Sequence, residues 1–250
     1  MCYNSRERGV LLEKGCDYLS KRISVALALL IIISTSLLLF DGIIFRFVML
    51  FGLLCAAIEL FYSRSSSPLN DSDRNFIAML IVLSAIFFGL ASTPRTNIVV
   101  VAGVCAADVF AYIFGKTFGG RLITARPFPH ASPNKTWEGI IAAVVGSACV
   151  VSATIYIVDG FTFDNMAFAD CVLYGCGILA VVGDYIESCY KRDCRVKDSC
   201  EFIPESSRVM RIAEELLGGA EGHGGYLDRL DSLIFTSAVL LFVYAPFSLI

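Results

Sequence analysis

The stretch E-G-H-G-G-Y-L-D-R-L-D-S-L-I-F-T-S-A-V-L-L-F, residues 221–242, sets a polar cluster directly against an apolar segment. One of the two histidines of the chain, a glycine pair and two aspartates stand in its first half, and the apolar run that follows covers 230–250. A helix needs roughly 17–25 apolar residues to cross a bilayer. The stretch therefore predicts a transmembrane helix that carries a polar cluster at its first turn.

The composition of the whole chain indicates the same class of protein. Of 250 residues, 56% are hydrophobic and only 17% are charged, whereas soluble domains carry about 25% charged residues. Seven runs are long and apolar enough to span a membrane, and they lie at 23–40, 43–62, 76–92, 97–118, 138–158, 167–190 and 230–250. The sequence thus predicts an all-α, polytopic integral membrane protein with about seven transmembrane helices, eight being the alternative.

The lysines and arginines indicate how these helices are oriented. The segments 1–22, 63–75, 119–137 and 191–229 hold 17 of the 20 basic residues, and short loops rich in such residues face the cytoplasm. This pattern places the N-terminus in the cytoplasm. The polar N-terminal segment is 22 residues long and no small-x-small site clearly ends the first apolar run, so a cleavable signal peptide is not expected and 23–40 is predicted to be a retained helix.

One group of polar residues lies within the run A-D-V-F-A-Y-I-F-G-K-T-F-G-G-R, residues 107–121. Asp108 stands in an otherwise apolar helix, and Tyr112 and Gly115 share its face. Lys116 follows toward the cytoplasmic end. An ionisable residue inside a span is costly and usually faces a cavity or a partner, so we expect a functional cleft here. A structural ion pair between helices is the alternative.

A second group lies in the proline-rich loop R-P-F-P-H-A-S-P-N-K-T-W-E-G, residues 126–139. Ser132, Lys135 and Thr136 precede the next predicted span. Hydroxyl groups and a lysine before a helix N-terminus can cradle a phosphate. Turn and helix-cap chemistry is the alternative explanation for the same residue types.

A third group, within 183–199, follows the sixth apolar run. If this segment is helical, Asp184, Glu187, Ser188 and Lys191 fall on one face. Carboxylates on one face suit a hard divalent cation, and the basic residues beyond them suit phosphates. A salt-bridged helix end that faces water is the alternative.

The opening stretch supplies complementary groups. Asp228 and Asp231 share one face if the last helix begins just before them. Gly224 and Gly225 allow the backbone to approach an anion closely, and His223 can contact a phosphate or carry a proton. Helix capping is the alternative, but it accounts for one aspartate at most.

The segments 183–199 and 221–232 together resemble the signature of the phosphatidate cytidylyltransferases, the CDP-diacylglycerol synthases. That signature runs Ser-x-hydrophobic-Lys-Arg, four residues, Lys-Asp, then a short link to His-Gly-Gly, hydrophobic-x-Asp-Arg-x-Asp. The upstream stretches D-V-F-A-Y-I-F-G-K-T-F-G and S-P-N-K-T-W-E-G also resemble motifs of this family. The residues that match the signature in register are Ser188, Lys191, Arg192, Lys197, Asp198, His223, Gly224, Gly225, Asp228, Arg229 and Asp231.

The chain departs from the family pattern at one place above all. Pro204 normally precedes the histidine by two residues, whereas here it lies 19 positions before His223, so 205–221 is an insertion in the active loop. Its pattern is typical of a short amphipathic helix, and lengthening a loop costs entropy only slowly. We expect the insertion to fold outward. A catalytically inactive relative, in which it splits the carboxylate cluster, remains the alternative.

The resemblance implies a reaction in which CTP and phosphatidic acid give CDP-diacylglycerol and pyrophosphate. It implies N-terminal membrane helices over 1–96 and a catalytic membrane domain over 97–250. It also implies Mg²⁺, with K⁺ as the candidate second cation, held by Asp184, Asp228 and Asp231. The catalytic residues it implies are Asp184, Lys191, Lys197, Asp198, His223, Asp228, Arg229 and Asp231. The substrate-binding residues expected beside them are Asp108, Lys116, Ser132, Lys135, Thr136, Glu187, Ser188, Arg192, Gly224 and Gly225.

The expected partners are CTP, phosphatidic acid, the lipid bilayer and a second copy of the chain, and no nucleic acid is expected. The expected location is a bacterial inner membrane with the active site on the cytoplasmic face. A cation-coupled transporter is the alternative from another class, but it predicts charges near mid-span and inverted repeats. A CDP-alcohol phosphotransferase is disfavoured because its D-G-x-x-A-R pattern is absent.

Overall fold

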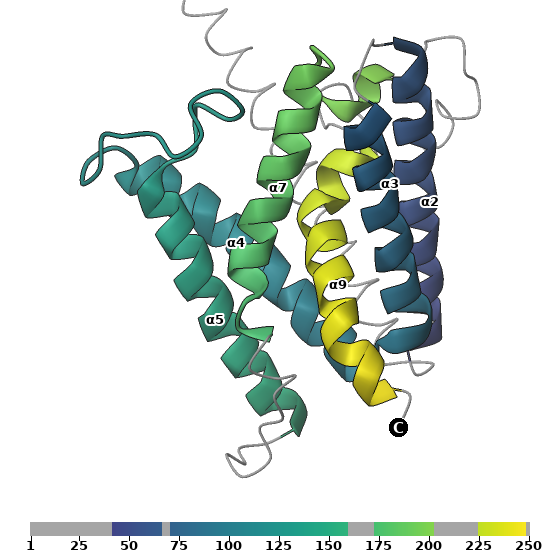
Figure 1. The fold of residues 1–250 in the computed structure, drawn as a ribbon. Helices are drawn as coiled ribbons and strands as arrows, with labels where there is room; N and C mark the ends of the chain where they lie inside the picture. The colour runs from purple at the N-terminus through teal and green to yellow at the C-terminus, as the bar shows by residue number, and fades with distance from the viewer. Residues whose placement is uncertain (1–41, 67–70, 160–172, 203–224, 249–250) are drawn as a thin grey trace, which may run out of the picture. The chain divides into compact units, whose positions relative to one another are not determined.

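The computed structural model describes four parts of the chain (Figure 1), residues 42–66, 71–159, 173–202 and 225–248. The chain divides into two units, 1–45 and 46–250, and all but the first turn of the described helices belongs to the second unit. Several predictions fall outside the described residues: the span at 23–40, the insertion at 205–221, His223 and Gly224. The predicted boundary between 96 and 97 stays a prediction.

All regular structure in the described parts of the chain is helical, which confirms the all-α prediction there. The elements are α2 (Ile43–Ser66), α3 (Asp71–Ile86), the π-helical η2 (Phe87–Ala91), α4 (Pro94–Phe118), α5 (Trp137–Asp159), α7 (Cys176–Asp193), the 3₁₀ turn η4 (Ser199–Phe202) and α9 (Tyr226–Ser248).

Within the residues that the structure describes, four helical segments are long and apolar enough to cross a membrane, which supports a membrane protein. They are Ile43–Ser63, Ser72–Ala91, Pro94–Phe118 and Trp137–Val158. The predicted spans at 167–190 and 230–250 coincide with α7 and α9 over most of their length. That these two helices cross the membrane stays a prediction, as do the total number of spans and the orientation.

Local sequence explains where the helices around the site begin. Thr93 caps α4 by accepting a hydrogen bond from Thr96 N at 3.2 Å, and Pro94 occupies the first helical position, where no N–H is needed. Thr136 caps α5 in the same way and accepts from Gly139 N at 3.2 Å. The helix-cap explanation of Thr136 is therefore correct.

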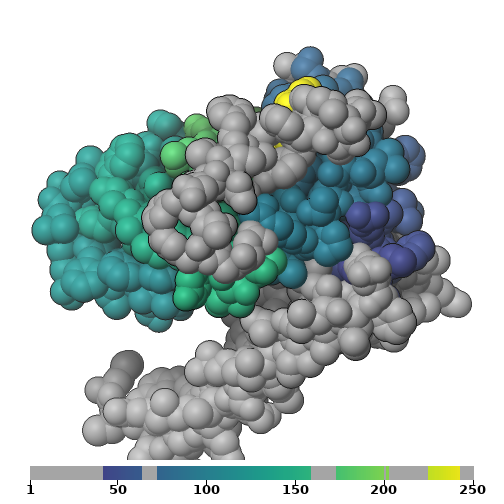
Figure 2. Space-filling view, turned by 90° about the horizontal axis from the view of Figure 1, so that it is seen from below, coloured from purple at the N-terminus to yellow at the C-terminus, as the bar shows by residue number. Residues whose placement is uncertain are grey.

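Helix packing brings the polar ends of four helices together. α4 packs along α5, and α7 packs along α9 and contacts α4 and α5. The loop that joins α4 to α5 lies at the end of the bundle where α7 stops and α9 begins (Figure 1). The end of α5 and the start of α4 lie at the other end of the bundle (Figure 1). Figure 2 views the protein from this end. The polar segments predicted from sequence thus converge on one end of the bundle.

Candidate active site

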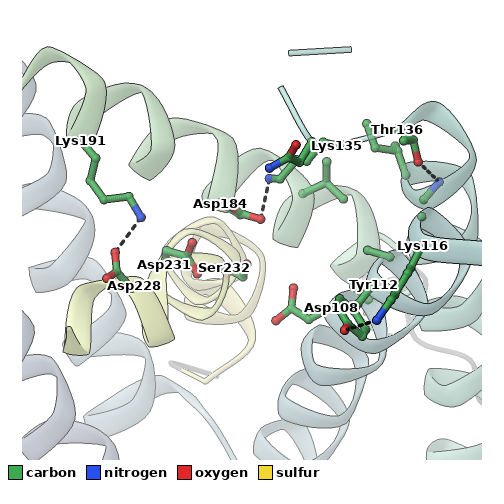
Figure 3. Close-up of a pocket in the computed structure, with 17 residues that line it drawn as sticks. Asp108, Tyr112, Lys116, Lys135, Thr136, Asp184, Lys191, Asp228, Asp231 and Ser232 are labelled. Atoms are coloured by element: carbon green, nitrogen blue, oxygen red, sulfur yellow. Dashed lines mark hydrogen bonds and ion pairs between the residues drawn. The ribbon is translucent and has the colours of Figure 1, made fainter. Parts of the chain in front are cut away.

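A cleft of about 610 Å³ opens where these polar ends meet (Figure 3). Its walls come from α4, the loop before α5, the start of α5, α7 and the first turns of α9. All three polar groups, and the aspartates of the opening stretch, contribute to this one space. The predicted site residues that line it are Asp108, Lys116, Lys135, Thr136, Asp184, Lys191, Asp228 and Asp231.

Three carboxylates on three different helices share the cleft. Asp108 lies on α4, Asp184 on α7 and Asp231 on α9 (Figure 3). The Asp231 carboxylate lies close enough to Asp184 and Asp108 for their charges to interact. Gly183 explains how α7 and α9 come so close, because a Cβ at this position would lie only 2.9 Å from Asp231 O. A single glycine thus lets Asp184 stand beside Asp231.

Asp184 contacts both the loop before α5 and its own helix. Its carboxylate forms an ion pair with Lys135 Nζ at 2.5 Å, which links α7 to the loop before α5. Ser188 Oγ, one turn further along α7, donates to Asp184 Oδ1 at 3.3 Å. The predicted one-face arrangement on this helix is therefore confirmed for these two residues.

Asp228 has a different environment from Asp231. Its Oδ1 accepts from Lys191 Nζ at 2.7 Å, and its Oδ2 accepts from Ser199 N at 2.9 Å and Gly225 N at 2.8 Å. The bond to Gly225, the residue before α9, is one half of a capping box. Burial alone would raise the pKa of this carboxyl, but hydrogen bonds from Glu187, Lys191 and Ser199 N outweigh burial and hold the pKa below its usual range.

The ammonium group of Lys191 forms two ion pairs within the protein. Its Nζ lies 2.7 Å from Asp228 Oδ1 and 2.6 Å from Glu187 Oε2. One cation therefore bridges two carboxylates and ties the last turns of α7 to the first turn of α9. Glu187 itself is buried, so its contact with Lys191 lies on the interior side of that ammonium group.

The lysines nearer the open part of the cleft are Lys116 and Lys135. Lys116 Nζ donates to Tyr112 Oη at 3.3 Å and lies 5.5 Å from the centre of the same ring. Lys135 Nζ, besides its ion pair with Asp184, lies 5.8 Å from the centre of the Phe128 ring. Both ammonium groups stand on the walls, where an anionic ligand can meet them.

The loop before α5 is held in place by contacts near its start and at its middle. Glu138 Oε1 accepts from Leu122 N and Ile123 N, each at 2.9 Å. Phe128 stacks on Tyr185 of α7, with ring centres 4.2 Å apart. The wall that carries Lys135 is therefore fixed to both α5 and α7.

Other predicted residues do not line the cleft. Arg192 donates from Nε to Ala131 O at 3.1 Å and from Nη1 to Val196 O at 3.2 Å, so it holds the loop. The side chains of Lys197 and Arg229 are exposed. The residues in this class are Ser132, Glu187, Ser188, Arg192, Lys197, Asp198 and Arg229. Their catalytic or binding roles stay predictions.

Gly225 has a structural explanation of its own. A Cβ at this position would overlap Ser199 Oγ and would lie 2.6 Å from Glu59 Oε2, so a larger residue would displace both of these side chains. Its N–H is already bonded to Asp228. The sequence pattern predicts that an anion approaches the backbone closely at this glycine. In the structure, the side chains of Ser199 and Glu59 lie against Gly225 instead.

The metal set predicted from the resemblance stays a prediction. Among the described residues, no three Asp, Glu, His or Cys side chains are grouped closely enough to hold a metal ion. Asp184 and Asp231 face the cleft together, whereas both oxygens of Asp228 have partners within the protein.

Sequence reasoning missed Glu59, the acidic residue of the apolar run 43–62. It lies on α2, is 0% exposed, and accepts hydrogen bonds from Tyr226 N, Leu227 N and Ser199 Oγ at 2.7, 2.9 and 3.0 Å. The sequence contains a sign of this role, because a single carboxylate inside a span is expected to have a polar partner. The identity of the partner was not available, since it lies 167 positions away.

Comparison with known proteins gives consistent results. A phosphatidate cytidylyltransferase of Rickettsia bellii is 31% identical over 174 residues, 67% of this chain and 66% of that protein. A phosphatidate cytidylyltransferase of Rickettsia conorii is 31% identical over 189 residues, 72% of this chain and 71% of that protein. The chloroplastic phosphatidate cytidylyltransferase 4 of Arabidopsis thaliana is 38% identical over 143 residues, 55% of this chain, which spans only 29% of that relative's length.

The family assignment rests on a match over most of the sequence. A model described as the cytidylyltransferase family matches residues 16–206. This range contains the α4 segment, the loop before α5 and the whole of α7. It ends beside the start of the predicted insertion, before the first turn of α9. With this match and the two Rickettsia relatives, the chain belongs to the cytidylyltransferase family.

Proposed function

We propose that this protein transfers the cytidylyl group of CTP to phosphatidic acid, giving CDP-diacylglycerol and pyrophosphate. The observation that carries the proposal is the cleft, which gathers carboxylates and lysines from three helices and the loop before α5 at one end of a membrane bundle. The family membership and the names of the relatives support the same reaction. A lipid substrate explains why such a polar site lies against apolar helices.

The chemistry joins two anions, so charge neutralisation and positioning are the main requirements. A phosphate oxygen of the lipid attacks the α-phosphorus of CTP, and the bond from that phosphorus to pyrophosphate breaks. Lys116 and Lys135 are placed to bind phosphate oxygens from two walls of the cleft. Binding there would draw Lys135 away from Asp184 and free that carboxylate. No side chain of the protein needs to act as a nucleophile.

The donor chemistry in the cleft fits Mg²⁺, a hard cation that prefers carboxylate oxygens. The proposed ligands are Asp184, Asp228 and Asp231, of which Asp184 and Asp231 face the cleft together. When bound, the ion would neutralise phosphate charge and stabilise the leaving pyrophosphate. Asp108 stands on the facing wall and completes the acidic lining. A second cation such as K⁺ is part of the same proposal.

The proposed location is argued from the distribution of charge. The cleft lies at the end of the bundle where the loop before α5 and the last turn of α7 lie (Figure 1), and these described parts belong to lysine- and arginine-rich segments of the sequence. This supports an active site on the cytoplasmic face of a bacterial inner membrane, where CTP is available. A homodimer is proposed on the family resemblance alone.

The transporter alternative is less well supported. Its charges are expected near the middle of the spans, and among the charged residues that line the cleft only Asp108 and Asp184 lie well inside their helices. The lysines of the cleft and Asp228 lie at helix ends: Lys116 is in the last turn of α4, Lys135 precedes α5, Lys191 is in the last turn of α7 and Asp228 is in the first turn of α9.

One assay tests the proposed reaction. Membranes containing the protein are supplied with CTP, phosphatidic acid and Mg²⁺, and pyrophosphate release and CDP-diacylglycerol formation are measured together. The matched control is Asp231→Asn, which keeps the shape of a cleft residue and removes its charge. We expect both products from the native chain and neither from the variant. Equal product formation by the two proteins, or none from the native chain, would contradict the proposal.

A further inference from the structure

Glu59 is a fully buried carboxylate that lies outside the cleft. It belongs to α2, which contributes no residue to the cleft lining. Its Oε1 accepts from Tyr226 N at 2.7 Å, and its Oε2 accepts from Leu227 N at 2.9 Å and from Ser199 Oγ at 3.0 Å. All three donors come from segments at the edge of the site, and none comes from α2 itself.

The three bonds fix the beginning of α9. The first N–H groups of a helix have no partner within the helix and need an external acceptor. Glu59 accepts from the first two residues of α9, and Asp228 accepts from Gly225 just before it. Two carboxylates therefore satisfy three successive backbone donors. The N-terminus of α9 is used by the protein itself and is closed to a substrate anion at these three positions.

Ser199 joins the two carboxylates. Its backbone N–H donates to Asp228 Oδ2 at 2.9 Å, and its hydroxyl donates to Glu59 Oε2. A continuous chain of polar contacts thus runs from Glu59 through Ser199 and Asp228 to Lys191. It connects α2, η4, α9 and α7 at the base of the cleft.

The Glu59 carboxylate depends on these hydrogen bonds because it is buried. A buried carboxylate is costly unless it is well supplied with hydrogen bonds. Here the three donors and the positive end of the α9 dipole offset the charge of Glu59. Moving the first turn of α9 would weaken these bonds and leave the buried charge less well compensated. The hydrogen bonds to Glu59 on α2 therefore resist small displacements of that turn.

We propose that Glu59 is a positioning residue, which fixes the first turn of α9 and thereby sets the placement of Asp228 and Asp231 at the cleft. Asp231 lies one turn beyond the N–H groups that Glu59 holds, so a shift of that turn moves its carboxylate relative to Asp184. The kinetic consequence rests on the proposed function. The anchoring of α9 does not.

The anchoring is tested by hydrogen exchange in the full-length protein in detergent. Glu59→Gln keeps the size of the side chain but cannot accept from all three donors. We expect faster exchange at Tyr226 and Leu227, with the later turns of α9 unchanged. Ser237→Ala is the matched control, because it removes a buried bond between α9 and α3, Ser84 Oγ to Ser237 Oγ at 2.7 Å, far along the same helix. Unchanged exchange at the first turn in Glu59→Gln would overturn the proposal.

The positioning role is tested by a kinetic comparison of the same variants. Misplacing a reacting group by about 1 Å can cost roughly 100-fold in rate. For Glu59→Gln we expect kcat to fall by roughly 10- to 100-fold and the Mg²⁺ concentration for half-maximal activity to rise, with the KM for phosphatidic acid unchanged. Ser237→Ala should lower the melting temperature without moving either kinetic quantity. Equal kinetic changes in both variants would assign Glu59 a merely structural role.

A milder variant keeps the test informative if Glu59→Gln folds poorly. Ser199→Ala removes only the hydroxyl bond and should show a smaller loss of kcat. The double variant should be no worse than Glu59→Gln alone, because the partner of the hydroxyl is already lost. Additive losses would contradict the shared network. If the native chain makes no CDP-diacylglycerol, the proposed function fails, while the exchange measurement still tests the anchor.

Discussion

Asp228 and Asp231 are three residues apart on one helix and have different surroundings. Asp228 is held by Lys191, Ser199 and Gly225, whereas Asp231 faces the carboxylates of the cleft. The sequence pattern cannot separate them, because both match the same motif and both lie near a helix start. The difference arises from η4 and α7, which reach one aspartate and not the other.

This difference predicts different effects of the two substitutions on stability. Asp228→Asn loses a charged partner of Lys191 and an acceptor for backbone N–H groups, so the free energy of unfolding should fall by about 2 kcal/mol. Asp231→Asn removes repulsion from neighbouring carboxylates, so stability should stay the same or rise, while product formation is lost. Thermal unfolding in detergent, followed beside the pyrophosphate assay, measures both. An equal loss of stability in the two variants would contradict the assignment.

At the scale of elements, the apolar runs predict the helices well and their ends less well. The helix α3 begins at Asp71 rather than 76, because its polar first turns continue the helix without adding to the apolar run. The convergence of the three polar groups could be expected from their common side of the membrane. The bond from Glu59 to α9 could not, since nothing local to α2 specifies a partner so distant in sequence.

The end of α7 offers a test of helix termination. Arg195 follows the helix with φ of 60°, and Arg195 N and Val196 N bond to Arg192 O and Lys191 O, both at 3.0 Å. This is a Schellman motif, whose left-handed position favours glycine. Arg195→Gly should therefore raise the free energy of unfolding by about 1 kcal/mol, while Arg195→Ala, which keeps the strained backbone, should give no gain. A lower melting temperature for the glycine variant would show that the arginine side chain matters more than the backbone.

For the whole molecule, the insertion at 205–221 is the largest departure from the family pattern. The family match ends at residue 206, and the described structure resumes at Gly225 with α9 already in contact with α2, α7 and η4. These contacts fix the start of α9 through residues outside the insertion. The carboxylates therefore need no support from the inserted segment.

Deleting 205–221 is expected to leave the reaction intact for this reason. Pro204 would then stand two residues before His223, as in the family pattern, and Ser199 would still donate to Glu59 and Asp228. Pyrophosphate release by the shortened chain should stay within about threefold of the native rate, since shortening a loop changes its closure entropy only slowly. Deletion of an equal length from the N-terminal segment 1–22, which lies outside 97–250, serves as the control. Loss of activity only in the loop deletion would mean that the insertion is part of the active site rather than an outward excursion.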